Sequence, residues 1–251
     1  MPNHVYNRVR FYTDPETKAR IILDVMNDED GPGSIDFEKL IPMPRELDIT
    51  DGSMTDAGEK LYVMYLSRLA DLGEDRDQDS AQTVRESVTK GDPVLEDRLD
   101  LGERAVRNRE LYGHRSWYGW SIDNWGTKWN AYTLGEEPPD DGTIAFYTAW
   151  DAPLPVIEAL SDRYSGVTMR LEYADEDVGS NVGRITYRAG SVVDKDIPDP
   201  GSARAYEMYA DITGNDLSDL GLIFDRDAGN YVYRRGMDQE QAQSQDDGLQ
   251  L

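Results

Sequence analysis

The fold depends most on residues 116–151, which read SWYGWSIDNWGTKWNAYTLGEEPPDDGTIAFYTAWD. All five tryptophans of the 251-residue chain lie in this stretch: Trp117, Trp120, Trp125, Trp129 and Trp150. Buried aromatic rings contribute strongly to core stability, and the polar tips of Trp and Tyr need hydrogen-bond partners. The stretch therefore predicts a densely packed core, and the alternative is a recognition surface.

Composition limits the class of protein. The length suggests one or two domains and is sufficient for a core without disulfides or metals. The chain has no cysteine, which excludes disulfides, thiolate metal sites and cysteine nucleophiles and fits a cytoplasmic location. No apolar run reaches the roughly 20 residues of a membrane span, and residues 1–6 lack the features of a signal peptide. We expect a cytoplasmic protein without membrane contact.

The net charge is the strongest global feature. Fifty acidic residues outnumber 26 basic ones, which gives a net charge of -24, and the pI is about 4.3. Such a field repels nucleic acid and attracts cationic partners. The charge has two interpretations. In the first it reflects genome composition or adaptation to salt and serves only solubility. In the second one face imitates DNA, which carries a negative charge every ~1.7 Å.

The order of predicted elements indicates an α+β fold. Residues 3–13 predict a strand, and Asp14 with Pro15 predicts the start of a helix whose apolar stripe is Ala19, Ile22, Leu23 and Met26. Residues 55–112 predict a helical insertion with a long helix from Pro93 to Tyr112. Beyond the tryptophan stretch we expect a strand at 143–150, a helix after it, and a hairpin of strands 167–173 and 182–189.

We expect three regions. A domain with packed helices on an antiparallel sheet spans residues 1–194 and includes the insertion. A small C-terminal extension, residues 195–237, carries a helix at 203–213 and a short hairpin around residues 227–230. Residues 238–251 are polar and predict a disordered tail.

Catalytic motifs are missing from the sequence. It contains neither of the glycine-rich phosphate-binding motifs, Gly-x-x-x-x-Gly-Lys-Ser/Thr and Gly-x-Gly-x-x-Gly. The Gly-x-Ser-x-Gly motif of a serine nucleophile is also missing. The two histidines, His4 and His114, lie far apart in the sequence. Asp75, Asp77 and Asp79 alternate like the start of a calcium loop, but Ser80 stands where that loop requires glycine. We therefore predict no enzyme activity, no cofactor and no metal.

Several segments together resemble the YubB ferredoxin-like family, whose members are carried by plasmids and phages. They are residues 1–5 (MPNHV), 37–47 (FEKLIPMPREL), 124–131 (NWGTKWNA), 146–157 (FYTAWDAPLPVI) and 171–173 (LEY). The resemblance implies a ferredoxin-like fold and a mobile genetic element, and it brings no activity and no catalytic residues. It does not extend to the acidity or to the region after Asp194.

Our first functional hypothesis is a non-enzymatic interaction protein that inhibits a host CRISPR or restriction complex. It would present a DNA-like acidic surface to a host protein or nucleoprotein complex with a basic groove, and no direct DNA binding is expected. The candidate contact residues are Glu74, Asp75, Asp77, Asp79, Glu96, Asp97, Asp100, Glu103, Asp175, Glu176, Asp177, Asp216 and Asp219.

The second hypothesis is a small-molecule or nucleotide-binding domain with its pocket in the tryptophan stretch. Ligand pockets combine apolar walls with a few polar groups. The candidate residues are Asn124, Trp125, Thr127, Lys128, Trp129 and Asn130. In the alternative interpretation Trp125 and Trp129 belong to the core and Lys128 pairs with Asp123.

Overall fold

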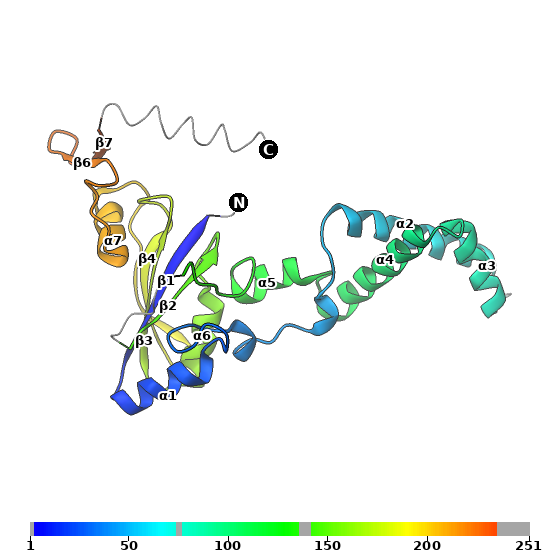
Figure 1. The fold of residues 1–251 in the computed structure, drawn as a ribbon, viewed down its shortest axis with the longest axis horizontal. Helices are drawn as coiled ribbons and strands as arrows, with labels where there is room; N and C mark the ends of the chain where they lie inside the picture. The colour runs from blue at the N-terminus through cyan, green and yellow to red at the C-terminus, as the bar shows by residue number, and fades with distance from the viewer. Residues whose placement is uncertain (1–2, 74–76, 136–141, 235–251) are drawn as a thin grey trace. The chain divides into compact units, whose positions relative to one another are not determined.

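The computed structural model describes residues 3–73, 77–135 and 142–234. The chain divides into two compact units (Figure 1). Met1–Ile41 and Gly126–Leu251 form one, which we call the sheet unit, and Pro42–Trp125 form the other, which we call the helical unit. The predicted tail at 238–251 lies outside the described residues, as do Glu74 and Asp75.

The sheet unit is built on five antiparallel strands. Their order across the sheet is β2-β1-β3-β4-β5, and each neighbouring pair is antiparallel. The strands are β1 (His4–Tyr12), β2 (Ile144–Ala149), β3 (Thr168–Asp175), β4 (Val182–Arg188) and β5 (Ser191–Asp196). The N-terminal strand thus pairs with two strands that follow the helical unit in sequence.

Helices cover the sheet from two sides. They are α1 (Pro15–Val25), α6 (Leu154–Arg163) and α7 (Ala203–Thr213), and a 3₁₀ turn, η1, spans Phe37–Lys39. Figure 1 shows α1 and α6 on the face opposite to α7. Asp14 caps α1 as predicted, because its carboxylate accepts a hydrogen bond from the Thr17 amide at 2.9 Å.

Side chains on β1 alternate between these two faces. Val5, Val9 and Phe11 are buried, whereas Arg8 and Arg10 on the other face are partly exposed. This alternation follows from the two-residue period of a strand. The face with Val5 forms the main core, and the opposite face is the one on which α7 packs.

α7 covers only one end of its face. A second core joins its buried residues to β3, β4, the loop after the helix and the strand that starts at Leu222; the members are Ala174, Val182, Ala205, Met208, Tyr209, Ile212, Leu217 and Leu222. The predicted C-terminal hairpin is present as β6 (Leu222–Asp225) and β7 (Asn230–Tyr233). The predicted C-terminal extension therefore shares a core with the sheet.

β5 is a strand that the sequence analysis did not anticipate. It crosses the predicted boundary at residue 194 and forms an edge of the sheet. Val192 and Val193 are adjacent and both exposed, so the strand shows no alternation of buried and exposed residues that would distinguish it from a loop. Asp194, Lys195 and Asp196 place charges on the edge, which discourages pairing with another chain.

The helical unit is larger than the expected insertion at 55–112. It contains η2 (Arg45–Leu47), α2 (Ser53–Asp71), α3 (Gln78–Thr89), α4 (Pro93–Tyr112) and α5 (Trp117–Trp125). α2 and α4 pack along each other. The first part of the tryptophan stretch is α5, which buries Trp120 and Trp125 with their rings edge to face at 5.4 Å.

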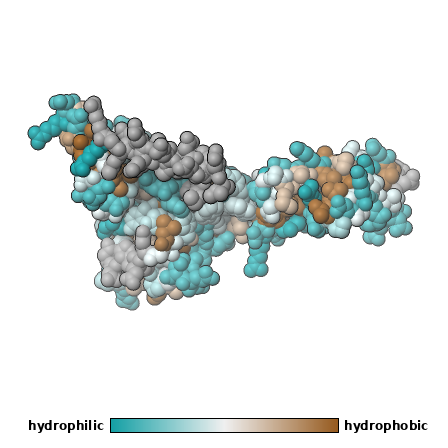
Figure 2. Space-filling model, turned by 45° about the horizontal axis from the view of Figure 1, so that its top comes forward, coloured by the Kyte–Doolittle hydropathy of each residue, from teal (hydrophilic) through white to brown (hydrophobic). Residues whose placement is uncertain are grey.

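The helical unit also exposes apolar side chains. Figure 2 shows apolar surface among the polar residues of this unit. Val63 and Leu66 of α2, and Val94 and Leu111 of α4, are each more than a third exposed. Within the described residues no helix is apolar over a length that would cross a bilayer.

Candidate functional site

The acidic residues predicted for partner binding lie in both units. Those at positions 77–103 belong to the helical unit, and those at 175–219 belong to the sheet unit. Asp77 caps α3 through the Ser80 amide at 2.8 Å. Glu96 accepts a 2.6 Å hydrogen bond from Nε of Arg85, which also forms an ion pair with Asp100. Several of these carboxylates therefore have structural partners.

Other predicted acidic residues are exposed on the surface. In the helical unit these are Asp79, Asp97 and Glu103, and in the sheet unit Glu176, Asp177, Asp216 and Asp219. Asp216 binds the Ser218 amide at 2.8 Å. Helix α4 also carries Arg98, Arg104, Arg107 and Arg109 among its acids, so the helix is not a uniformly negative surface.

The polar groups of the tryptophan stretch serve the fold. Thr127 is buried and donates a 2.7 Å hydrogen bond to the Ala149 carbonyl oxygen, and it accepts one from the Ala149 amide at 3.1 Å. Asn130 accepts a hydrogen bond from the Phe37 amide at 2.8 Å and donates one to Asp36. These contacts hold the segment against β2 and η1.

The other candidate pocket residues, from Asn124 to Trp129, also contact neighbouring parts of the chain. Asn124 donates a hydrogen bond to the Trp120 carbonyl oxygen at 2.9 Å, and Trp125 is buried. The Lys128 ammonium lies 4.4 Å from the centre of the Trp129 ring. Asp123, the expected partner of Lys128, instead lies 3.5 Å from Nε2 of His114.

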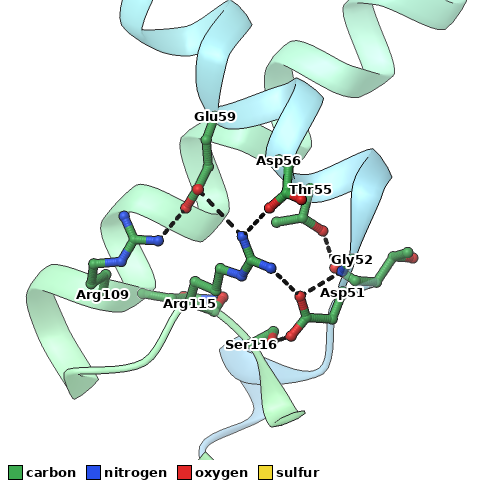
Figure 3. A network of polar contacts seen from close by, with 10 residues as sticks. Asp51, Gly52, Thr55, Asp56, Glu59, Arg109, Arg115 and Ser116 are labelled. Carbon is green, nitrogen blue, oxygen red and sulfur yellow. Dashed lines mark hydrogen bonds and ion pairs between the residues drawn. The ribbon is translucent and has the colours of Figure 1, made fainter. Parts of the chain in front are cut away.

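An ion-pair network fixes the start of α2 in the helical unit (Figure 3). Arg115 donates to Asp51 and to Asp56, both at 2.6 Å, and its guanidinium lies 3.4 Å from Glu59. Ser116 donates to the second oxygen of Asp51 at 2.5 Å. Burial raises the pKa of Asp51, but hydrogen bonds from Ser116, Gly52 and Arg115 outweigh it and hold this pKa below its usual value. The network is structural.

A pocket of about 330 Å³ lies in the sheet unit between α7 and the adjoining ends of β1, β2 and β3. We call it the tyrosine pocket. Its lining residues are His4, Tyr6, Leu134, Tyr147, Ala174, Asp175, Glu176, Tyr209, Thr213 and Asn215. Pairing of β1 with β2 sets Tyr6 directly opposite Tyr147. Sequence positions more than 200 residues apart thus meet at one site.

Aromatic rings form one wall of this pocket. The ring centres of Tyr6 and Tyr147 are 5.5 Å apart, and Tyr132 stacks on Tyr147 at 6.3 Å. Nδ1 of His4 lies 2.7 Å from the Tyr132 hydroxyl, which donates to the Thr148 carbonyl oxygen at 3.1 Å. These contacts orient the rings before any ligand arrives.

Carboxylates supply negative charge at the pocket. The Glu176 amide donates to the His4 carbonyl oxygen at 2.9 Å, which places this residue beside the rings. Burial, together with the charge of Glu176, raises the pKa of Tyr132 to about 12. Asp175 is buried and accepts hydrogen bonds from Asn3 and Asn181 at 3.1 and 3.2 Å. Tyr132 therefore stays neutral while Glu176 presents an exposed negative charge.

Only part of this pocket was expected from the sequence. Asp175 and Glu176 were candidate contact residues because of their charge, whereas His4, Tyr6, Tyr147 and Tyr209 were not among the candidates. The sequence predicted that the aromatic residues of β1 and β2 belong to strands, but it did not predict which strands pair with each other. Among the described residues no group of three or more His, Cys, Asp or Glu side chains is arranged to hold a metal ion.

Comparison with known proteins identifies the fold of the second half of the chain. Residues 125–216 match the family model described as a ferredoxin-like domain in Api92-like protein. This range contains β2 to β5, α6 and α7, so the predicted α+β, ferredoxin-like fold class is confirmed. No curated protein sequence matches the chain.

A crystal structure of protein api92 from Yersinia pseudotuberculosis is also similar. The two chains share 13% identity, the match covers 80% of this chain and 99% of that chain, and the TM-score is 0.36. The predicted membership of the YubB family is wrong, because the matching family model is that of Api92-like protein. The association with mobile genetic elements rested only on the resemblance to the YubB family, so no observation now supports it.

Proposed function

We propose that this protein is a non-enzymatic interaction protein that captures a cationic side chain of a basic partner in the tyrosine pocket. The observation that carries the proposal is the meeting of the Tyr6, Tyr147 and Tyr209 side chains with Glu176 around a cavity of about 330 Å³. The faces of aromatic rings attract cations, and aromatic cages bind alkylated ammonium groups. A nearby carboxylate adds a direct charge attraction.

Size and charge both favour a protein side chain as the ligand. A cavity of this size is at the lower end of ligand pockets, so it suits a lysine or arginine side chain better than a large cofactor. The net charge of -24 steers basic partners toward the surface. The partner class remains the one expected from sequence, a protein or nucleoprotein complex with a basic groove.

Inhibition of a CRISPR or restriction complex through DNA mimicry stays a narrower prediction. The acidic residues proposed for it lie in two units, and some of them pair with arginines. A mimic would thus use the exposed acids of one unit, such as Asp216 and Asp219 of the sheet unit. Competition between DNA and this protein for the partner, measured once the partner is known, would test the prediction.

The test of the proposed function is titration calorimetry with short peptides that carry lysine, trimethyllysine or arginine. The Glu176→Gln variant removes the carboxylate beside the rings, and Asp177→Asn is its matched control because it removes the same charge from the next exposed residue. We expect Glu176→Gln to weaken binding about fivefold, as the loss of about 1 kcal/mol implies, and Asp177→Asn to have little effect.

Two results would overturn the assignment. One is the absence of binding to all three cationic peptides at low salt. The other is equal weakening by Glu176→Gln and Asp177→Asn, because this would show a general attraction to the acidic surface and no specific pocket.

A further inference from the structure

A group of arginines lies on the part of the sheet face that α7 leaves uncovered. We call it the arginine face; its members are Arg8 and Arg10 of β1, Arg170 of β3, and Arg184 and Arg188 of β4. Strand register aligns them in rows across the sheet. Arg10 is opposite Arg170, and Glu172 lies between Arg8 and Arg184. A protein with a net charge of -24 thus concentrates positive charge on one surface.

Glu172 orients part of this face. Its side chain is only 5% exposed, and it pairs with Arg8 at 2.8 Å, Arg10 at 2.9 Å and Arg184 at 3.1 Å. Arg184 also contacts Asp211 of α7. One buried carboxylate therefore holds three guanidinium groups on the sheet, and positive charge remains in excess over β1, β3 and β4.

The pairing of Arg10 with Arg170 is unfavourable for the sheet itself. Like charges directly opposite each other on neighbouring strands destabilise the pair. Within the described residues Nε of Arg170 is buried without a hydrogen-bond partner, and the guanidinium lies 5.5 Å from the centre of the half-exposed Tyr12 ring. Binding of an anion between the two guanidinium groups would relieve this repulsion.

We propose that the arginine face binds single-stranded nucleic acid. Guanidinium groups make paired hydrogen bonds to phosphate oxygens, and the Tyr12 ring with the Arg170 plane offers a surface on which a base can stack. A flat sheet face suits splayed bases, whereas the grooves of duplex DNA admit a helix or a two-stranded ribbon. On β5, Asp194 and Asp196 make the outer edge negative, so the strand would run over β1, β3 and β4.

This inference goes beyond the proposed function, because it concerns a different surface and an anionic ligand. It also departs from the sequence-based expectation of no direct DNA binding. Net charge describes the field far from the molecule, whereas contacts depend on the charges within a Debye length of about 8–10 Å. The two proposals fail independently, since Glu176 belongs to the tyrosine pocket and Arg170 to the arginine face.

The test is fluorescence anisotropy with labelled 12-mers of single-stranded DNA, single-stranded RNA and duplex DNA, at about 50 mM and about 200 mM salt. The variant is Arg170→Ala. The matched control is Arg226→Ala, which removes an exposed arginine from the turn between β6 and β7. Urea unfolding of each variant accompanies the binding measurements.

We expect the unaltered protein to bind single strands more tightly than the duplex. Arg170→Ala should weaken this binding about tenfold and lower the slope of log affinity against log salt by about 0.7, the value of one phosphate contact. Its urea midpoint should be unchanged or higher, because the opposed charges are gone. The Arg226→Ala control should bind like the unaltered protein.

Three binding results would overturn the proposal. They are the absence of single-strand binding at about 50 mM salt, equal losses in Arg170→Ala and Arg226→Ala, and duplex binding as tight as single-strand binding. A lower urea midpoint in Arg170→Ala would show that the residue serves stability and would also contradict the proposal.

Discussion

Gly58 of α2 and Gly102 of α4 face each other where the two helices make backbone contact. A Cβ atom on Gly58 would lie 2.5 Å from the Arg98 carbonyl oxygen, and one on Gly102 would overlap the Gly58 backbone. Both glycines are buried. Helices approach this closely only where neither residue carries a side chain at the contact.

The first prediction concerns this contact. Gly102→Ala should destabilise the helical unit by about 1–3 kcal/mol, since overpacking outweighs the gain in helix propensity. Urea unfolding followed by circular dichroism measures the change. Gly166→Ala is the control, because a Cβ at that glycine meets no atom within 4 Å. An unchanged stability of Gly102→Ala would show that the helices can separate without cost.

The second prediction concerns the network around Arg115. Arg115→Lys keeps the charge but loses the planar fork that reaches Asp51 and Asp56, so we expect a loss of about 2 kcal/mol. The matched control is Arg109→Lys, whose side chain is 52% exposed and pairs with Glu59. Exposed ion pairs contribute little, so the control should change stability by less than about 1 kcal/mol. Equal effects would refute a special role for Arg115.

The third prediction concerns acid sensitivity. Burial raises the pKa of Glu172, but hydrogen bonds and charges from Arg10 and Arg8 outweigh it and leave this pKa below its usual 4.5. A carboxyl whose pKa is lower in the folded state stabilises the fold above its unfolded pKa and loses this contribution as pH falls. We expect stability to drop below about pH 4.5.

Glu172→Gln checks this explanation. The substitution should lower stability at pH 7 by about 3 kcal/mol, since it leaves three arginines without their shared carboxylate. It should also reduce the drop in stability between pH 5 and pH 3. A variant that keeps the full acid transition would assign the transition to other carboxylates.

The fourth prediction separates a structural role from ligand binding in the tryptophan stretch. Thr127→Val removes the hydroxyl that bonds both backbone groups of Ala149 and should cost about 1–3 kcal/mol. Thr127→Ser keeps the hydroxyl and should recover most of this loss. Thermal unfolding measures both variants. If Thr127→Val left stability unchanged and altered binding of a nucleotide, the pocket hypothesis would gain support over the structural one.

Local sequence signals are sufficient to predict most of the helices and strands. Asp14-Pro15 and Asp92-Pro93 set the starts of α1 and α4 because a carboxylate cap and a proline in the first turn act locally. Alternation of apolar and polar residues marked β3 and β4 as strands, because it too is a local signal. The fold class followed from the order of these elements.

Which faces are buried, and which residues come into contact, depends on long-range packing. In α1 the buried residues are Ile21 and Val25, and the predicted stripe is wrong because Leu23 is 54% exposed. The run from Ile21 to Met26 contains two possible stripes, and packing against the sheet selected one. The tyrosine pocket and the arginine face depend in the same way on strand pairing, which joins β1 to partners more than 130 residues away. Long-range register carries no local signal, so the sequence supplied these residues and the fold assembled them into sites.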